Sequence, residues 1–136
     1  MTDITKVALF EGNKIRRHCD NEKELWYFSI IDIVQTLTGS SIPRRYWSDL
    51  KINLHKEGSE LYEKIVQLKM KSSDGKHYLT DTADTETVLR LIQSIPSPKA
   101  EPFKLWLART GYERLEETAD PEIAINRALE TYLQKG

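Results

Sequence analysis

The most informative part of the sequence is Pro43-Arg44-Arg45-Tyr46-Trp47-Ser48-Asp49-Leu50-Lys51. Proline suits the first turn of a helix, where its missing N–H costs little, so the stretch predicts a helix that begins at Pro43. The polar pattern continues to about Lys56, and Gly58 follows as a stop signal. Two arginines, two aromatic residues and a lysine therefore fall within the first turns of one helix.

The 3.6-residue period divides this helix into two sides. The apolar side holds Pro43, Tyr46, Trp47, Leu50 and Leu54. The polar side holds Arg44, Ser48, Lys51 and His55. A stripe at helical spacing is most often buried, so we expect Trp47 in the core rather than in contact with a ligand. Arg44, Arg45 and Lys51 then remain exposed, either as a solvated face or to meet a partner.

Strands and further helices surround this element in the sequence. Turn signals and alternating patterns predict one hairpin over residues 7–17, a strand over 25–28 and a second hairpin over 65–80. Ser29 and Gly39 bound a short helix over 30–37, and two more helices are expected over 84–95 and 102–111. A helical link over 112–117 and a last helix from Asp120 complete an α+β fold with about five helices.

Composition limits the class of protein. The chain has 136 residues, of which 39% are hydrophobic and 30% charged, as in ordinary globular domains. No apolar run reaches the length of a membrane span, and residues 1–12 lack the layout of a signal peptide. The single cysteine, Cys19, excludes an internal disulfide. We therefore expect a cytoplasmic protein that does not bind membranes.

Catalytic and metal chemistry find little support in the sequence. His18-Cys19-Asp20 has ligand atoms, but no second Cys/His pair follows at zinc-finger spacing, and His55 and His77 are isolated. The sequence contains no glycine-rich phosphate-binding loop. It also shows no pair of carboxylates at a spacing that indicates general acid–base catalysis. We expect no catalytic residues, no metal and no cofactor, and hence a protein that is not an enzyme.

Charge is distributed unevenly along the chain, although the formal net charge is only −1. Residues 42–80 hold eight Lys/Arg against five Asp/Glu, and residues 113–136 hold three against six. Basic side chains near a hairpin tip commonly contact phosphates, but lysines also protect exposed strand edges. If the partner is DNA, the predicted phosphate contacts are Arg44, Arg45, Lys51, Lys69, Lys71 and Lys76.

The chain resembles the Bro-N domain, the N-terminal module of baculovirus BRO proteins and of phage and prophage antirepressor-like proteins. The segments that carry the resemblance are Ile15-Arg16-Arg17, Trp26-Tyr27-Phe28-Ser29-Ile30-Ile31-Asp32-Ile33-Val34, the Pro43–Lys51 stretch, Gly58-Ser59-Glu60-Leu61-Tyr62, Tyr78-Leu79-Thr80-Asp81, Leu89-Arg90-Leu91-Ile92 and residues 98–108. The resemblance covers residues 7–112. It implies an α+β fold, DNA binding and a regulatory rather than catalytic role.

Two functional hypotheses follow from these observations. The first is a DNA-binding regulator of transcription, derived from a prophage, with modest and salt-dependent affinity for duplex or single strands. The second is an antirepressor module that binds a phage-type repressor protein instead of DNA. Residues 113–136 are expected to form an appended helical segment that begins or links to a C-terminal region. Its apolar stripe packs on the chain's own core or forms a homodimer contact.

Overall fold

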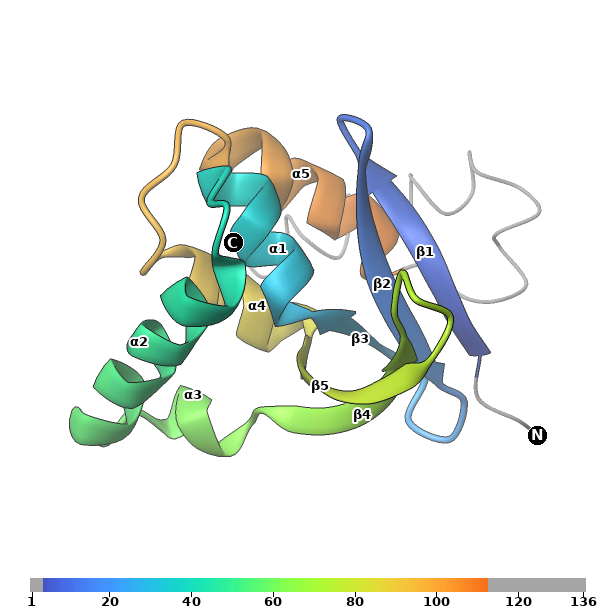
Figure 1. The fold of residues 1–136 in the computed structure, drawn as a ribbon, viewed down its shortest axis with the longest axis horizontal. Helices are drawn as coiled ribbons and strands as arrows, with labels where there is room; N and C mark the ends of the chain where they lie inside the picture. Colours follow the sequence, from blue (N-terminus) through green and yellow to red (C-terminus); the bar gives the residue numbers. More distant parts are fainter. Residues whose placement is uncertain (1–3, 113–136) are drawn as a thin grey trace.

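The computed structural model describes residues 4–112, which form five strands and five helices around one antiparallel sheet (Figure 1). The strands are β1 (Ile4–Phe10), β2 (Asn13–Asp20), β3 (Leu25–Ser29), β4 (Val66–Lys71) and β5 (His77–Asp84). The helices are α1 (Ile30–Thr38), α2 (Pro43–Lys56), α3 (Glu60–Glu63), α4 (Thr85–Ile92) and α5 (Ala100–Thr110). The α+β class expected from the sequence is confirmed.

The strand order of the sheet is β1-β2-β3-β5-β4, which places β1 and β4 at its two edges. Glu11 and Gly12 form the two-residue turn between β1 and β2, with φ angles of 49° and 82°. Two consecutive positive φ angles are typical of a type I′ turn, whose twist matches that of the strands it joins. Phe10 therefore pairs with Asn13 across this turn, and the expected first hairpin is confirmed.

The hairpin β4–β5 is attached to the sheet at its inner end, where Thr82–Asp84 of β5 pair with β3. Its outer end curves until the turn lies beside β2 (Figure 1). There the Arg16 side chain donates a hydrogen bond from Nη1 to the backbone carbonyl of Lys71, at 3.2 Å. This curvature brings the end of β4 close to β2, although the two strands are three positions apart in the sheet.

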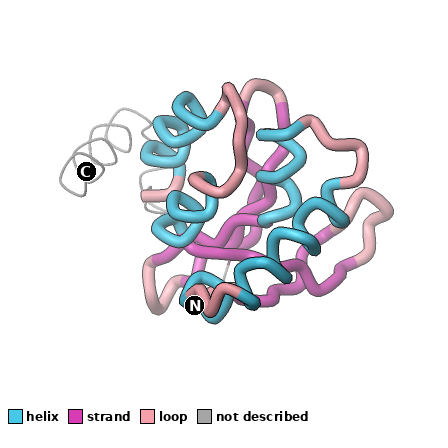
Figure 2. Tube along the Cα trace, turned by 90° about the vertical axis from the view of Figure 1, so that its left-hand side faces the viewer, coloured by secondary structure: helices cyan, strands magenta, loops and turns pink. Residues whose placement is uncertain are grey.

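The helices gather on one side of the sheet and lie in front of the strands in Figure 2. Aromatic side chains fill the core between them: the Phe10 ring centroid lies 5.1 Å from that of Phe103 and 5.7 Å from that of Trp106. Trp47 is 2% exposed, which confirms its expected place in the core. The apolar side of α2 thus fixes the direction in which the polar side faces.

Some boundaries differ from the expectations. The sequence pattern does not predict α3, because four residues are too few to show a helical period; the Ser59 hydroxyl accepts a hydrogen bond from the Leu61 amide and starts this helix. Strand β5 extends to Asp84 instead of Thr80, and α4 ends at Ile92 instead of Ile95. The helical segment expected over residues 113–136, with its dimer contact, lies outside the described residues.

Among residues 4–112, none of the helices combines the length and the apolar character that crossing a membrane requires.

Candidate nucleic-acid interface

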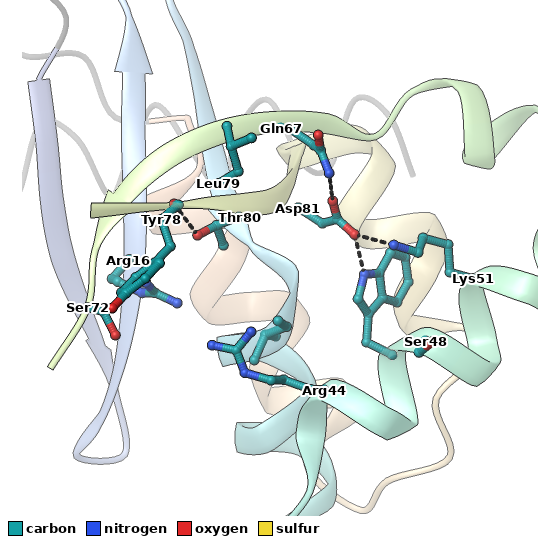
Figure 3. A pocket seen from close by; sticks show the side chains of 12 residues that line it. Arg16, Arg44, Ser48, Lys51, Gln67, Ser72, Tyr78, Leu79, Thr80 and Asp81 are labelled. Atoms are coloured by element: carbon teal, nitrogen blue, oxygen red, sulfur yellow. Dashed lines mark hydrogen bonds and ion pairs between the residues drawn. The ribbon is translucent and has the colours of Figure 1, made fainter. Parts of the chain in front are cut away.

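Two adjoining hollows lie between helix α2, the hairpin β4–β5 and strand β2. The inner pocket has a volume of about 230 Å³ and is lined by Arg16, Ile31, Arg44, Trp47, Ser48, Lys51, Gln67, Ser72, Tyr78, Leu79, Thr80 and Asp81 (Figure 3). The outer groove has a volume of about 870 Å³ and is lined by Lys6, Val7, Lys14, Arg16, Ile31, Asp32, Gln35, Ser41, Ile42, Pro43, Arg44, Lys71, Ser72 and Ser73. The hollows share Arg16, Ile31, Arg44 and Ser72, so they form one continuous surface depression.

Helix α2 supplies the polar wall of the inner pocket. Arg44, Ser48 and Lys51 follow one another at a spacing of four and three residues and line the pocket together. Their shared side is the one that the helical period predicts from the sequence. Since Trp47 is buried on the apolar side, packing of the helix against the core turns these three side chains toward the hairpin.

The Asp81 carboxylate connects α2 to the hairpin. It accepts hydrogen bonds from Trp47 Nε1 at 2.8 Å, from Lys51 Nζ at 2.7 Å and from Gln67 Nε2 at 3.1 Å (Figure 3). Burial favours a raised pKa for this carboxyl, but the hydrogen bonds from Lys51, Trp47 and Gln67 outweigh it and hold the pKa of Asp81 below its ordinary value. Asp81 is therefore an ionised anchor within the pocket wall.

This contact corrects one expectation about Lys51. The helical pattern predicts an exposed cation, whereas its side chain is 35% exposed and forms an ion pair with Asp81, whose side chain is 10% exposed. The local sequence pattern cannot indicate the partner of Lys51, because Asp81 lies 30 residues away on β5. Lys51 still lines the pocket, but its charge is largely offset by that of Asp81.

A second ion pair connects β2 to α1. The Arg16 guanidinium binds both oxygens of the Asp32 carboxylate, with Nε–Oδ2 and Nη2–Oδ1 distances of 2.8 Å and 3.0 Å. It also donates to the Ser29 hydroxyl at 3.2 Å and to the Lys71 carbonyl at 3.2 Å. A planar guanidinium suits such forked geometry, so Arg16 holds the edges of both hollows in place.

Four further cations line the hollows without such partners. They are Lys6 of β1, Lys14 of β2, Arg44 of α2 and Lys71 of β4, and all four are exposed. Within the described part of the chain, none of their side chains has a hydrogen bond or an ion pair. Together the two hollows hold six Lys/Arg and two Asp/Glu, and both acids belong to the ion pairs above. The depression is therefore a local positive region on a protein of near-zero net charge.

Three of the six residues that the sequence predicts as phosphate contacts line the hollows. Arg44 and Lys51 line the inner pocket, and Arg44 and Lys71 line the outer groove. Arg45, Lys69 and Lys76 are exposed but line neither hollow. Arg45 follows Arg44 by one residue and thus points about 100° around the helix, so adjacent arginines do not serve the same surface.

Three lining cations, Lys6, Lys14 and Arg16, are missing from the contacts predicted from the sequence. Alternation along β2 could have indicated two of them, because Ile15 and Arg17 are buried while Lys14 and Arg16 face the opposite side. Their closeness to the hairpin β4–β5 carries no such local signal, since it depends on the curvature of the sheet.

Tyr78 adds an aromatic ring to the wall of the inner pocket. Its side chain is 46% exposed, and Figure 3 shows the ring pointing toward Arg16 and Ser72. The hydroxyl donates to the Asp74 carboxylate at 2.5 Å, which raises the pKa of Tyr78 and lowers that of Asp74. An exposed aromatic ring beside cations is a surface on which a nucleobase can stack.

No group of three or more His, Cys, Asp and Glu residues within residues 4–112 is arranged to hold a metal ion. The depression is lined by guanidinium, ammonium and hydroxyl groups, which are donors that can bind an anion.

Comparison with protein families gives a match to the BRO family, N-terminal domain (Bro-N), over residues 14–114. The matched region runs from β2 through α5 and contains the inner pocket and all of the outer groove except its β1 residues. Comparison with curated proteins and with solved structures gives no significant match.

Proposed function

The chain belongs to the BRO family through its N-terminal domain, and we propose that this domain is a non-catalytic regulatory module that binds DNA along the outer groove. One observation carries the proposal: four cations from four different elements, Lys6, Lys14, Arg44 and Lys71, converge on one depression without partners in the described chain. Both acids of that depression are already ion-paired. An unneutralised cluster of this kind favours a polyanion.

The number of free cations sets the expected salt dependence. Each phosphate contact on duplex DNA contributes about −0.9 to the slope of log affinity against log salt, so four contacts give a slope of about −3.6. Affinity should then fall about a hundredfold between 50 mM and 200 mM salt. On single strands the slope per contact is about −0.7, and stacking on Tyr78 would add affinity.

The neighbouring arginines of α2 offer a matched test. Fluorescence anisotropy with labelled duplex and single strands, at several salt concentrations, measures affinity and slope for wild type, Arg44→Ala and Arg45→Ala. Arg44 lines the groove and Arg45 does not, so Arg44→Ala should reduce the slope by about 0.9 on duplex DNA and Arg45→Ala by less. Lys23→Ala, at the exposed turn between β2 and β3, controls for net charge. Absence of binding at 50 mM salt contradicts the proposal.

A second candidate function is an antirepressor that binds a repressor protein of the phage type. The observation that favours it is the apolar content of the same groove, where Val7 is 52% and Ile42 58% exposed. Exposed apolar side chains next to cations are typical of protein interfaces. Replacement of Val7 and Ile42 by serine should weaken binding of a phage-type repressor and leave the salt slope for DNA unchanged. A loss of DNA binding in that variant would argue against separate functions.

A further inference from the structure

The inner pocket contains three polar side chains that make no hydrogen bond or ion pair within residues 4–112: the Arg44 guanidinium and the hydroxyls of Ser48 and Ser72. They come from both walls, since Arg44 and Ser48 lie on α2 and Ser72 lies at the end of β4. Figure 3 shows Arg44 reaching across the space toward Arg16 and Ser72. Donors from two elements thus converge on one small volume.

No carboxylate that lines the inner pocket is free to balance the charge of Arg44. Arg16 uses four of its five N–H donors on Asp32, Ser29 and the Lys71 carbonyl, which leaves one donor. The Asp81 carboxylate already accepts hydrogen bonds from Lys51, Trp47 and Gln67. The Arg44 guanidinium therefore has no counter-ion among the described residues, and a bound anion with several acceptor oxygens can supply one.

We propose that the inner pocket binds a single phosphate group of a nucleic acid, with Arg44, Ser48 and Ser72 as its donors. This inference rests on the proposed function, because the strand attached to the phosphate continues along the outer groove. The pocket volume of about 230 Å³ is smaller than that of usual small-molecule sites, at about 300–1,000 Å³. It accommodates a phosphate and the adjoining sugar, while further nucleotides lie outside.

The route for those nucleotides is the outer groove, which shares Arg16, Arg44 and Ser72 with the pocket. Lys71 and Lys14 line this groove and can contact the next phosphates. The group in the pocket is a terminal phosphate or an internal phosphodiester, and both offer oxygens to the same donors. The pocket contact and the lysine contacts along the groove together fix the position of the strand on the protein.

The test removes the pocket hydroxyls without changing any charge. Titrations use hexathymidylate with and without a 5′-phosphate, and inorganic phosphate alone, followed by anisotropy and by phosphorus NMR of the oligonucleotide. Wild type is compared with Ser48→Ala/Ser72→Ala, and with Ser94→Ala, which removes an exposed hydroxyl outside both hollows. Thermal unfolding of each variant verifies that the fold is retained, and Arg44→Gln provides a second pocket variant.

The double serine variant should lose about tenfold in affinity with an unchanged salt slope, because it removes hydrogen bonds to a charged group but no cation. Tighter binding of the 5′-phosphorylated strand, with a shifted phosphomonoester signal, supports a terminal phosphate in the pocket. Equal binding of both strands, with a shifted phosphodiester signal, supports an internal one. Competition by inorganic phosphate, lost in the variant, supports a pocket that also accepts the free ion.

Unchanged affinity and unchanged phosphorus signals in both pocket variants, while the oligonucleotides still bind wild type, overturn the pocket proposal and leave the proposed function standing. Absence of oligonucleotide binding to wild type at low salt overturns both.

Discussion

The inner pocket and the outer groove are both lined by cations, but they use them differently. In the pocket, Lys51 is offset by Asp81 and Arg16 by Asp32, so most of the charge holds the elements together. In the groove, Lys6, Lys14 and Lys71 have no partners in the described chain. The number of cations on a surface therefore differs from the number that is available to bind a ligand.

Removal of two groove lysines should weaken DNA binding strongly. Lys14→Ala with Lys71→Ala should reduce duplex affinity about fiftyfold at 100 mM salt and reduce the salt slope by about 1.8, because two counterion-releasing contacts are lost. The free energy of unfolding should change little, since neither side chain has a partner in the described chain. Anisotropy titrations and urea unfolding measure the two quantities. A large loss of stability would contradict the distinction between groove and pocket.

Removal of the Asp81 carboxylate from the pocket wall should destabilise the fold. Asp81→Ala leaves the buried Trp47 Nε1 and the Lys51 ammonium without their acceptor, and should lower the free energy of unfolding by about 2 kcal/mol. Urea denaturation measures it. Asp49→Ala, which replaces an exposed acid of α2 without a hydrogen bond or ion pair in the described chain, is the matched control and should have a much smaller effect. Equal effects of the two variants would show that Asp81 does not anchor α2.

A smaller effect concerns acid stability. The pKa of Asp81 is lower in the folded state than the ordinary value of 3.8, so the ionised carboxylate stabilises the fold above that value. The stabilisation is lost as pH falls through the folded-state pKa. The stability difference between wild type and Asp81→Asn should therefore shrink as the pH is lowered below about 3.8. Urea unfolding at a series of pH values tests this, and a difference that grows with acid would contradict it.

Replacement of Lys51 should change DNA binding very little. Lys51→Gln should leave the salt slope of DNA binding nearly unchanged, because Asp81 already neutralises this cation. In an Asp81→Asn background the slope should rise by about 0.9 with Lys51 present and return when Lys51 is replaced by Gln. Anisotropy at several salt concentrations gives all four slopes. A slope that falls by about 0.9 in the single Lys51 variant would place Lys51 with the groove cations instead.

Local patterns predicted the elements of the fold well, for reasons visible in particular residues. Gly12 at the first turn, Ser29 and Gly39 around α1, and Pro43 at the start of α2 act within a few residues of their own position. The burial of Trp47 also follows from a local period. The α+β class could therefore be derived from the sequence.

The candidate site could be derived only in part, because it depends on contacts between distant residues. Asp81 forms an ion pair with Lys51, which is 30 residues away in the sequence. Arg16 donates a hydrogen bond to the carbonyl of Lys71, which is 55 residues away. Neither contact has a sequence signal: the packing of α2 against β5 creates the first, and the curvature of the outer end of the hairpin β4–β5 creates the second. The predicted contacts Arg44 and Lys71 line the groove, and the helical period alone separates Arg45 from Arg44, whereas the positions of Lys69 and Lys76 outside both hollows required the structure.

The donation from Arg16 to the Lys71 carbonyl has a consequence for hydrogen exchange. The turn beyond Lys71 closes through the Ser72 amide, which donates to the Lys76 carbonyl at 2.8 Å. This turn lies at the far end of the hairpin from the segment that pairs with β3, so its amides should exchange through local opening rather than global unfolding. A ligand that bridges Arg16 and Lys71 opposes that opening. Slower deuterium uptake at the Ser72 and Gly75 amides would thus show that a ligand is bound beside the turn. This measurement uses the wild-type protein and needs no attached label.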